Sequence, residues 1–283
     1  GDQEEKFFHG YYGHYCYLPL YAFSGEWLLA SLLRFAGQDA SADGLRPLRM
    51  IVDRIQTRWP DARIILRADS GFARERIMKW CEQWDVDYVL GLAKNDRLKR
   101  ALANQMQRAK ERCEETGDTV RLYDEFRYET LDTWSKKRRV IAKAEYSPLG
   151  ANPRFVVTSL PRRDLCPKAI YEVIYCQRGE SENRIKEVQG ELFAHRLSTH
   201  WMDANQLRIY FSSVAYLFVC LLRRVALRGT SWAKAQAGTL RAKLFKIGAQ
   251  IEVTVRHVWI RMSSAYPYQE RFHTIFEQTR AGP

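Results

Sequence analysis

The chain has 283 residues, enough for one large domain or two small ones, so a stable core requires neither disulfides nor a structural metal. Apolar residues make up 46% of the chain and aromatic residues 13%, a globular composition that excludes a disordered protein. The formal net charge of +12 excludes an acidic solvating protein and favours a polyanionic partner.

Neither a membrane nor an exported protein is indicated. The best apolar run, Ile209 to Leu222, is shorter than the roughly 18 residues that a membrane span requires. No charged segment followed by an apolar one opens the chain, and the six scattered cysteines include no Cys-x-x-Cys pair. We therefore expect a cytoplasmic protein with reduced thiols and no zinc site.

In chain order, the first part of the sequence predicts a β-hairpin, a helix, a strand, a helix and a strand, over residues 15–36, 43–59, 63–69, 74–84 and 87–93. The hairpin is indicated by two apolar runs joined at Gly25-Glu26, and the first helix by apolar residues at helical spacing that stop before Pro60. The two later strands are short, continuous apolar runs, which are typical of strands buried on both faces. This order predicts an α/β fold with a mixed sheet.

The pattern changes after residue 95. A charged helix comes first, and it is followed by a mostly β insertion whose strand-like segments cover residues 119–129, 139–146 and 155–160. Helical patterns then resume and continue almost to the end of the chain. We predict four parts: the first part of a core, the β-rich insertion, a helical region that carries Glu182, and a basic helical C-terminal part, over residues 1–95, 96–166, 167–202 and 203–283.

Asp69 is the first residue with more chemistry than a core requires. It stands at the carboxyl end of a predicted buried strand and is followed by Ser70 and Gly71. In open α/β sheets, ligands and metals gather at that edge. The alternative is that Asp69 only caps the turn after the strand.

A second candidate site lies on the predicted helix that follows the insertion. At 100° per residue, one face of that helix would carry Tyr175, Arg178, Glu182, Lys186 and Gln189. This face suits a metal-bound phosphate, with Glu182 for the metal and the two cations for the phosphate oxygens. The alternative is ordinary ion pairing between residues one turn apart on a solvated face.

Together these segments resemble the bacterial insertion-sequence transposases of the DDE class, over residues 7 to about 225. The resemblance rests on three blocks and on a Tyr-x2-Arg-x3-Glu signature that begins at Tyr175. The blocks read His-Gly-Tyr-Tyr, Arg-Ala-Asp-Ser-Gly-Phe and Glu-Asn-Arg-Ile-Lys-Glu, at residues 9–12, 67–72 and 182–187.

The resemblance implies an RNase H-like fold and two Mg²⁺ ions, which Mn²⁺ can replace, held by three carboxylates. It implies that Asp69 bridges both metals, that Glu182 holds one, and that Tyr175, Arg178 and Lys186 grip phosphates near the end of the element. The implied reaction is cut-and-paste transposition, in which water and then a 3′-hydroxyl act as nucleophiles. The implied partner is double-stranded DNA, both the terminal inverted repeats and the target, bound by a homodimer at the bacterial nucleoid.

Two positions depart from this family. Gln189 stands where the signature ends in Lys, and Lys186 is the nearest replacement. The first catalytic Asp of such proteins lies on a strand that precedes the hairpin, and we expect that strand upstream of residue 1. Asp2 would fall in the linker after it and is not assigned the role. We therefore expect the printed chain to be inactive by itself.

The charge pattern points to DNA independently of the resemblance. Residues 204–251 include eight Lys and Arg residues and no Asp or Glu. Phosphate neutralisation supplies most non-specific affinity for a duplex, so we expect DNA contacts from this segment and from the signature helix, at Arg184, Arg223, Arg224 and Arg228. The alternative is a solvated basic face around helices. Two other functions stay open: a DNA-binding transposase remnant that does not cut, and an RNase H-like nuclease of DNA repair.

Overall fold

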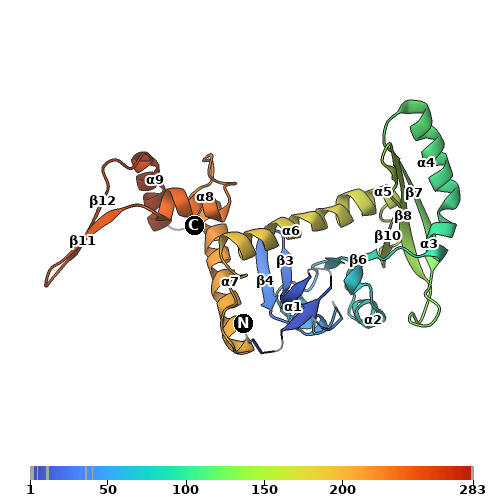
Figure 1. Ribbon diagram of the computed structural model, residues 1–283, viewed down its shortest axis with the longest axis horizontal. Helices are drawn as coiled ribbons and strands as arrows, with labels where there is room; N and C mark the ends of the chain where they lie inside the picture. The colour runs from blue at the N-terminus through green and yellow to red at the C-terminus, as the bar shows by residue number, and fades with distance from the viewer. Residues whose placement is uncertain (1–2, 5, 11–12, 36, 40, 282–283) are drawn as a thin grey trace. The chain divides into compact units, whose positions relative to one another are not determined.

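The computed structural model describes residues 3–4, 6–10, 13–35, 37–39 and 41–281. The chain divides into two compact units (Figure 1). Unit 1 combines residues 1–37 with residues 182–283, and unit 2 comprises residues 38–181. The division falls inside one helix, α6 (Gly179–Lys186).

Among the described residues, unit 2 is built on a six-stranded mixed sheet. The order is β5-β6-β10-β8-β7, with β9 beside β8. β5 and β6 are parallel and the other pairs are antiparallel. The strands are β5 (Ile65–Ala68), β6 (Asp87–Leu92), β7 (Val120–Tyr128), β8 (Arg138–Ser147), β9 (Gly150–Ala151) and β10 (Arg154–Thr158).

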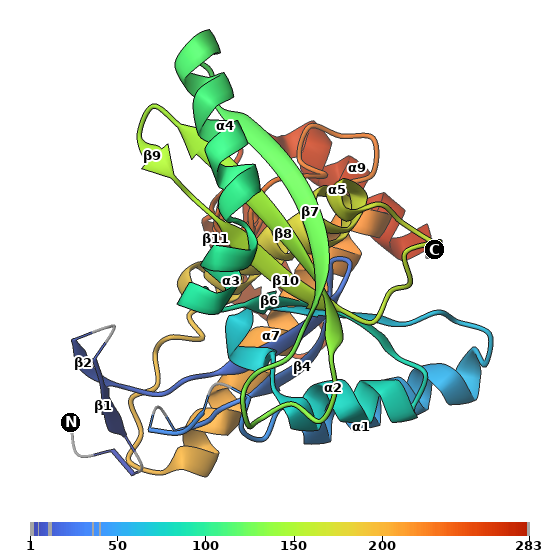
Figure 2. The ribbon, with the colours of Figure 1, turned by 90° about the vertical axis from the view of Figure 1, so that its right-hand side faces the viewer.

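Helices cover the sheet of unit 2, and both faces of the sheet are buried. The helices are α1 (Leu45–Arg58), α2 (Glu75–Gln83), α3 (Asp96–Ala101) and α4 (Ala103–Thr116), and Figure 2 shows α4 lying along β7 and β8. Along β8, Val140 and Ala142 join one hydrophobic cluster, while Ile141 between them joins another with Ile170. Successive strand residues point to opposite faces, so this alternation shows two-sided burial.

The predicted α/β fold, a mixed sheet flanked by helices as in RNase H, is confirmed. The segments predicted as strands of an insertion are β7, β8 and β10, and β10 pairs directly with β6. They therefore extend the sheet that contains β5. The four predicted domain boundaries remain predictions.

Unit 1 contains the predicted hairpin, formed by β3 (Leu20–Ser24) and β4 (Trp27–Leu32). Gly25 takes a φ of +56° in the turn, a conformation that glycine adopts without steric cost. A short ribbon of β1 (Phe7–His9) and β2 (His14–Cys16) precedes the hairpin. Asp2, Tyr11 and Tyr12 lie outside the described residues.

The long helix α7 (Met202–Val225) packs on the hairpin of unit 1. The Gln206 side chain accepts a hydrogen bond from the Leu33 backbone at 2.6 Å and donates one to the Ser31 carbonyl at 3.2 Å. By length and composition alone, α7 could cross a membrane. The helix is longer than the apolar run Ile209 to Leu222 that the sequence indicated. Core helices of soluble proteins pass the same test, and here one side of α7 is packed on β4.

The predicted helical C-terminal part, residues 203–283, is mostly helical when α7 is included, and its later helices are α8 (Ala237–Leu240), η5 (Arg241–Phe245) and α9 (Gln269–Ala281). A two-stranded ribbon of β11 (Ala249–Val253) and β12 (Val258–Met262) interrupts it. The helical prediction did not include this ribbon. Its signal in the sequence is the alternation of apolar and other residues, which is the period of a strand.

Candidate active site

Asp69 follows the last residue of β5, at the edge where the parallel strands β5 and β6 both end. Its side chain caps the short helix η1 (Ser70–Phe72): Oδ1 accepts a hydrogen bond from the Gly71 backbone N–H at 2.9 Å. The capping role that the sequence left as an alternative is therefore observed. The carboxylate is exposed, so capping by one oxygen does not remove it from solvent or from a ligand.

Gly91 on β6 leaves room for the Tyr175 hydroxyl and for the backbone of the turn at Asp69 and Ser70. A Cβ atom at Gly91 would lie 2.6 Å from the Tyr175 hydroxyl oxygen and 2.9 Å from the Ser70 backbone nitrogen. Any larger residue would therefore displace Tyr175 or the turn that carries Asp69. An isolated glycine in a buried strand is the sequence signal for such a close approach.

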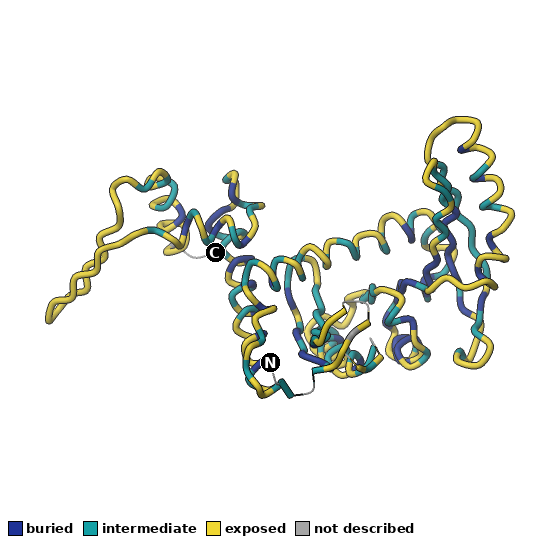
Figure 3. Tube along the Cα trace, in the orientation of Figure 1, coloured by how far each residue is buried: buried dark blue, intermediate teal, exposed yellow. Residues whose placement is uncertain are grey.

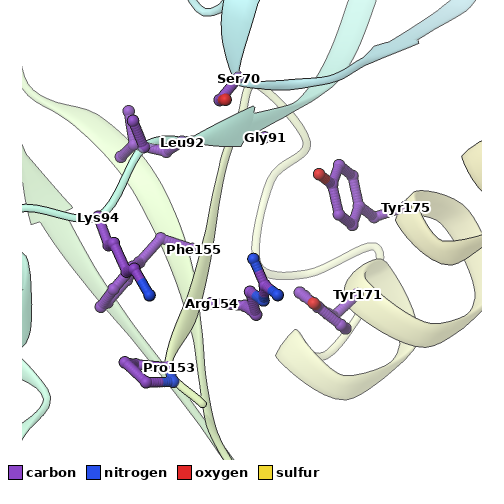
Figure 4. A pocket seen from close by; sticks show the side chains of 10 residues that line it. Ser70, Gly91, Leu92, Lys94, Pro153, Arg154, Phe155, Tyr171 and Tyr175 are labelled. Atoms are coloured by element: carbon purple, nitrogen blue, oxygen red, sulfur yellow. The ribbon is translucent and has the colours of Figure 1, made fainter. Parts of the chain in front are cut away.

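A pocket of about 290 Å³ opens beside this turn, within unit 2 (Figure 4). Its wall combines backbone at Ser70 and Gly91, two cations and the rings of Phe155, Tyr171 and Tyr175. Lys94 follows β6 and Arg154 begins β10, and no described carboxylate lines the pocket. Two cations without a lining carboxylate suit an anionic ligand. Neither cation could be assigned to a site from the sequence, because their proximity depends on the pairing of β6 with β10.

Tyr175 and Arg178, which stand three residues apart in the signature, are in contact in unit 2. The Arg178 guanidinium lies 5.7 Å from the centre of the Tyr175 ring. Burial raises the pKa of the Tyr175 hydroxyl, against the opposing effect of Arg178. The hydroxyl thus stays protonated at neutral pH and can donate a hydrogen bond to an anion.

The predicted single face from Tyr175 to Gln189 assumed a regular α-helix, and that assumption is wrong. The chain passes through the π-helix η2 (Ile170–Tyr175), the 3₁₀-helix η3 (Cys176–Arg178), α6, and the π-helix η4 (Glu187–Glu191). Each change of helix type changes the angle between successive side chains, so a constant 100° does not hold. π-helical turns are frequent at functional sites.

The remaining signature residues belong to unit 1. Glu182 and Lys186 are exposed on α6, and Arg184 is half-buried there. Burial raises the pKa of the Tyr21 hydroxyl on the hairpin to about 12, against an opposing effect of the Gln189 side chain. Gln189, which stands where the family has Lys, is half-buried in unit 1.

The described residues do not form a complete metal site. Carboxylates are suitable ligands for Mg²⁺ or Mn²⁺, and Asp69 and Glu182 are both exposed. However, no group of three or more Asp, Glu, His or Cys side chains among the described residues could hold a metal ion. Any two-metal chemistry therefore requires at least one ligand besides these two.

Of the three arginines near the end of α7, two are exposed and one is engaged inside unit 1. The Arg223 guanidinium pairs with Glu187 and also donates to the Ala235 carbonyl. Burial lowers the pKa of Arg223, but Glu187 outweighs burial and raises it. Arg224 lies over the Trp27 ring with an exposed side chain, and Arg228 is also exposed. DNA contact by these arginines remains a prediction.

A comparison with protein families gives one match of nearly full length. The family model is described as "Transposase DDE domain group 1" and covers residues 1–282. No curated protein matches the chain at a significant level.

Proposed function

The chain belongs to the DDE transposase family, and from this premise we propose that it catalyses metal-dependent strand cleavage and strand transfer at the ends of an insertion sequence. Transposition would follow the cut-and-paste route. The proposed partners are the terminal inverted repeats of the element and its target DNA, bound by a homodimer. The proposed location is the bacterial cytoplasm, at the nucleoid.

The observation that carries this proposal is the position of Asp69 beside the cationic pocket of unit 2. An exposed carboxylate stands at the carboxyl edge of a parallel strand pair, and Lys94, Arg154 and Tyr175 line the adjoining pocket. Scission of a phosphodiester needs a carboxylate for a metal and donors for the phosphate oxygens. Both kinds of group meet at this edge.

Mg²⁺ is the proposed cofactor, with Mn²⁺ as a substitute, and Asp69 and Glu182 are the proposed ligands. When bound, such ions neutralise charge on the scissile phosphate and activate the attacking oxygen. The chain itself would hold the DNA: Tyr175 would donate its hydroxyl proton to a phosphate oxygen, and Arg178 and Lys186 would supply positive charge.

We further propose that residues 1–283 alone do not cut DNA. Two metal ions bring about four positive charges, and two carboxylates offset only half of them. A DNA-binding protein that does not cut is therefore the second candidate function for this segment.

Cleavage assays on the complete reading frame test the proposal. Glu182→Gln and Asp69→Asn should each reduce nicking of an element-end duplex by at least about 1,000-fold, because metal ligands act as a unit. Both variants should bind the duplex nearly as well as the parent. Glu180→Gln, a neighbouring acid on α6, is the matched control and should retain activity.

Two results would contradict parts of the proposal. Nicking within tenfold of the parent by Glu182→Gln would move the metal role to another acid. Robust nicking by residues 1–283 that Asp69→Asn removes would show that these residues complete the site. Equal nicking of random duplex and element ends would instead indicate a nuclease without transposase specificity.

A further inference from the structure

One side of α7 exposes a continuous row of large apolar side chains, which we call the α7 seam: Leu207, Phe211, Val214, Phe218 and Leu221. Their exposed fractions are between 45% and 66%. Figure 3 shows exposed and buried residues alternating along this helix. Contiguous exposed apolar patches of this kind are rare on soluble monomers and mark interaction sites.

The spacing of the seam is that of a helix that packs against another helix. The intervals between its residues are four, three, four and three, which is the heptad repeat of coiled coils. Ala204 and Val225 continue the same repeat at the two ends of α7, where both are partly buried. The seam therefore runs straight along nearly the whole helix.

The helix cannot rotate to bury the seam. On its other side Ile209, Tyr216 and Cys220 are buried, with exposed fractions of 0–1%. Ser213 donates to the Ile209 carbonyl at 2.7 Å and bonds the Ser31 hydroxyl at 2.8 Å. Turning the seam inward would expose this packed side, so the seam needs a partner from outside α7.

The area of the seam is sufficient for a dimer. Large apolar side chains of this size, each about half exposed, present roughly 500 Å² per copy. Two copies would bury roughly 1,000 Å², the lower end of specific interfaces. The heptad spacing favours a second helix as the occupant, and DNA would require positive charge that the seam lacks. A lipid surface as the occupant would leave the chain monomeric in the sedimentation test below.

We propose that the α7 seam binds the α7 seam of a second copy of this chain. A two-fold pair uses the same surface on both copies, so one apolar row is complementary to itself, and Val214, the central residue, faces its own counterpart. The proposal deepens the homodimer of the proposed function and rests on it. Its test uses no DNA or metal, so its failure differs from a failure of cleavage.

Sedimentation of residues 1–283 tests the pairing. The chain should sediment as a dimer at micromolar concentration, and Phe211→Glu with Phe218→Glu should raise the dissociation constant about 100-fold. Because both side chains are exposed, folding should not change, which circular dichroism verifies. Phe245→Glu, an exposed phenylalanine outside α7, is the control and should leave the dimer intact.

A cysteine probe locates the contact. Val214→Cys, oxidised with diamide, should give a covalent dimer whose linked peptides both contain residue 214. Val255→Cys, at a fully exposed position on the β11–β12 turn, measures collisional linkage and should give little. A monomer at all concentrations, a dimer that survives the double glutamate variant, or equal linkage at both cysteines would each overturn the proposal.

Discussion

Unit 2 and unit 1 use their charged and apolar residues in opposite ways. In unit 2, Arg138 is 2% exposed and pairs with Glu75 and Glu82, and Arg139 pairs with Glu125. Unit 1 carries residues 204–251, which contain no acid, together with the exposed α7 seam. Cations that are matched inside a unit stabilise its fold, whereas unmatched cations and exposed apolar side chains remain available for partners.

The β11–β12 ribbon extends this contrast. Ile251 faces Ile260, and Val253 faces Val258, so four apolar side chains share one side of the ribbon. All four are at least 62% exposed. The corresponding strand residues in unit 2, such as Val89 and Val156, are fully buried. Substitutions at the buried ion pairs of unit 2 should therefore change stability, and substitutions at the exposed apolar and cationic positions of unit 1 should change binding.

The largest expected effect is on the buried ion cluster of unit 2. Arg138→Met should lower the free energy of unfolding by about 4 kcal/mol, because it leaves Glu75 and Glu82 without their shared cation. Arg162→Met, which removes an exposed partner of Glu125, should cost less than about 1 kcal/mol. Urea unfolding of both variants measures the difference. Equal losses would remove the distinction between buried and exposed ion pairs.

The next effect concerns the acid sensitivity of unit 2. Burial would raise the pKa of Glu145, but hydrogen bonds from Arg121, Lys143 and Asn152 outweigh it and lower the pKa to about 2. A lowered pKa stabilises the fold above the ordinary pKa of the group, near 4.5, and the contribution is lost as pH falls towards 2. The loss should amount to about 1–2 kcal/mol, because Arg121 is half exposed and solvent screens its charge. Between pH 6 and pH 2, the free energy of unfolding should depend less on pH in Glu145→Gln than in the parent. The same pH dependence in both proteins would refute the assignment.

A smaller effect is expected at the turn that carries Asp69. Gly91→Ala should cost about 2 kcal/mol, because its Cβ would overlap the Tyr175 hydroxyl and the Ser70 backbone. The cleavage rate of the complete protein should fall even under conditions where the variant stays folded, because the substitution displaces the turn that carries Asp69. Gly179→Ala is the matched control: nothing lies within 4 Å of the added atom, and the backbone there is helical. It should not destabilise the protein.

The smallest change is expected in the salt dependence of DNA binding, and it should differ between the exposed and the ion-paired arginines of unit 1. Replacing exposed Arg224 and Arg228 with Gln should lower the slope of log affinity against log salt by about one for each lost phosphate contact. Arg223→Gln should leave the slope unchanged and lower stability, because its guanidinium pairs with Glu187. Filter binding to duplex DNA at several salt concentrations measures both. A reduced slope for Arg223→Gln alone would reverse the assignment.

Local elements of this protein could be predicted from the sequence because their causes are local. The hairpin depends on Gly25 and the two apolar runs beside it, and α1 on helical spacing that ends before Pro60. Asp69 could be placed at the end of its strand for the same reason, since the strand and the Ser70-Gly71 turn are adjacent in the chain.

Other features were decided only by the tertiary structure. The pairing of β10 with β6 joins strands of the predicted core and of the predicted insertion in one sheet. The same pairing places Arg154 and Lys94 in the wall of one pocket. The chain changes helix type before and after α6, and the Arg223 guanidinium pairs with Glu187 inside unit 1. These outcomes depend on contacts between residues far apart in the chain, and no local pattern specifies which distant partner a strand edge or a charged side chain will find.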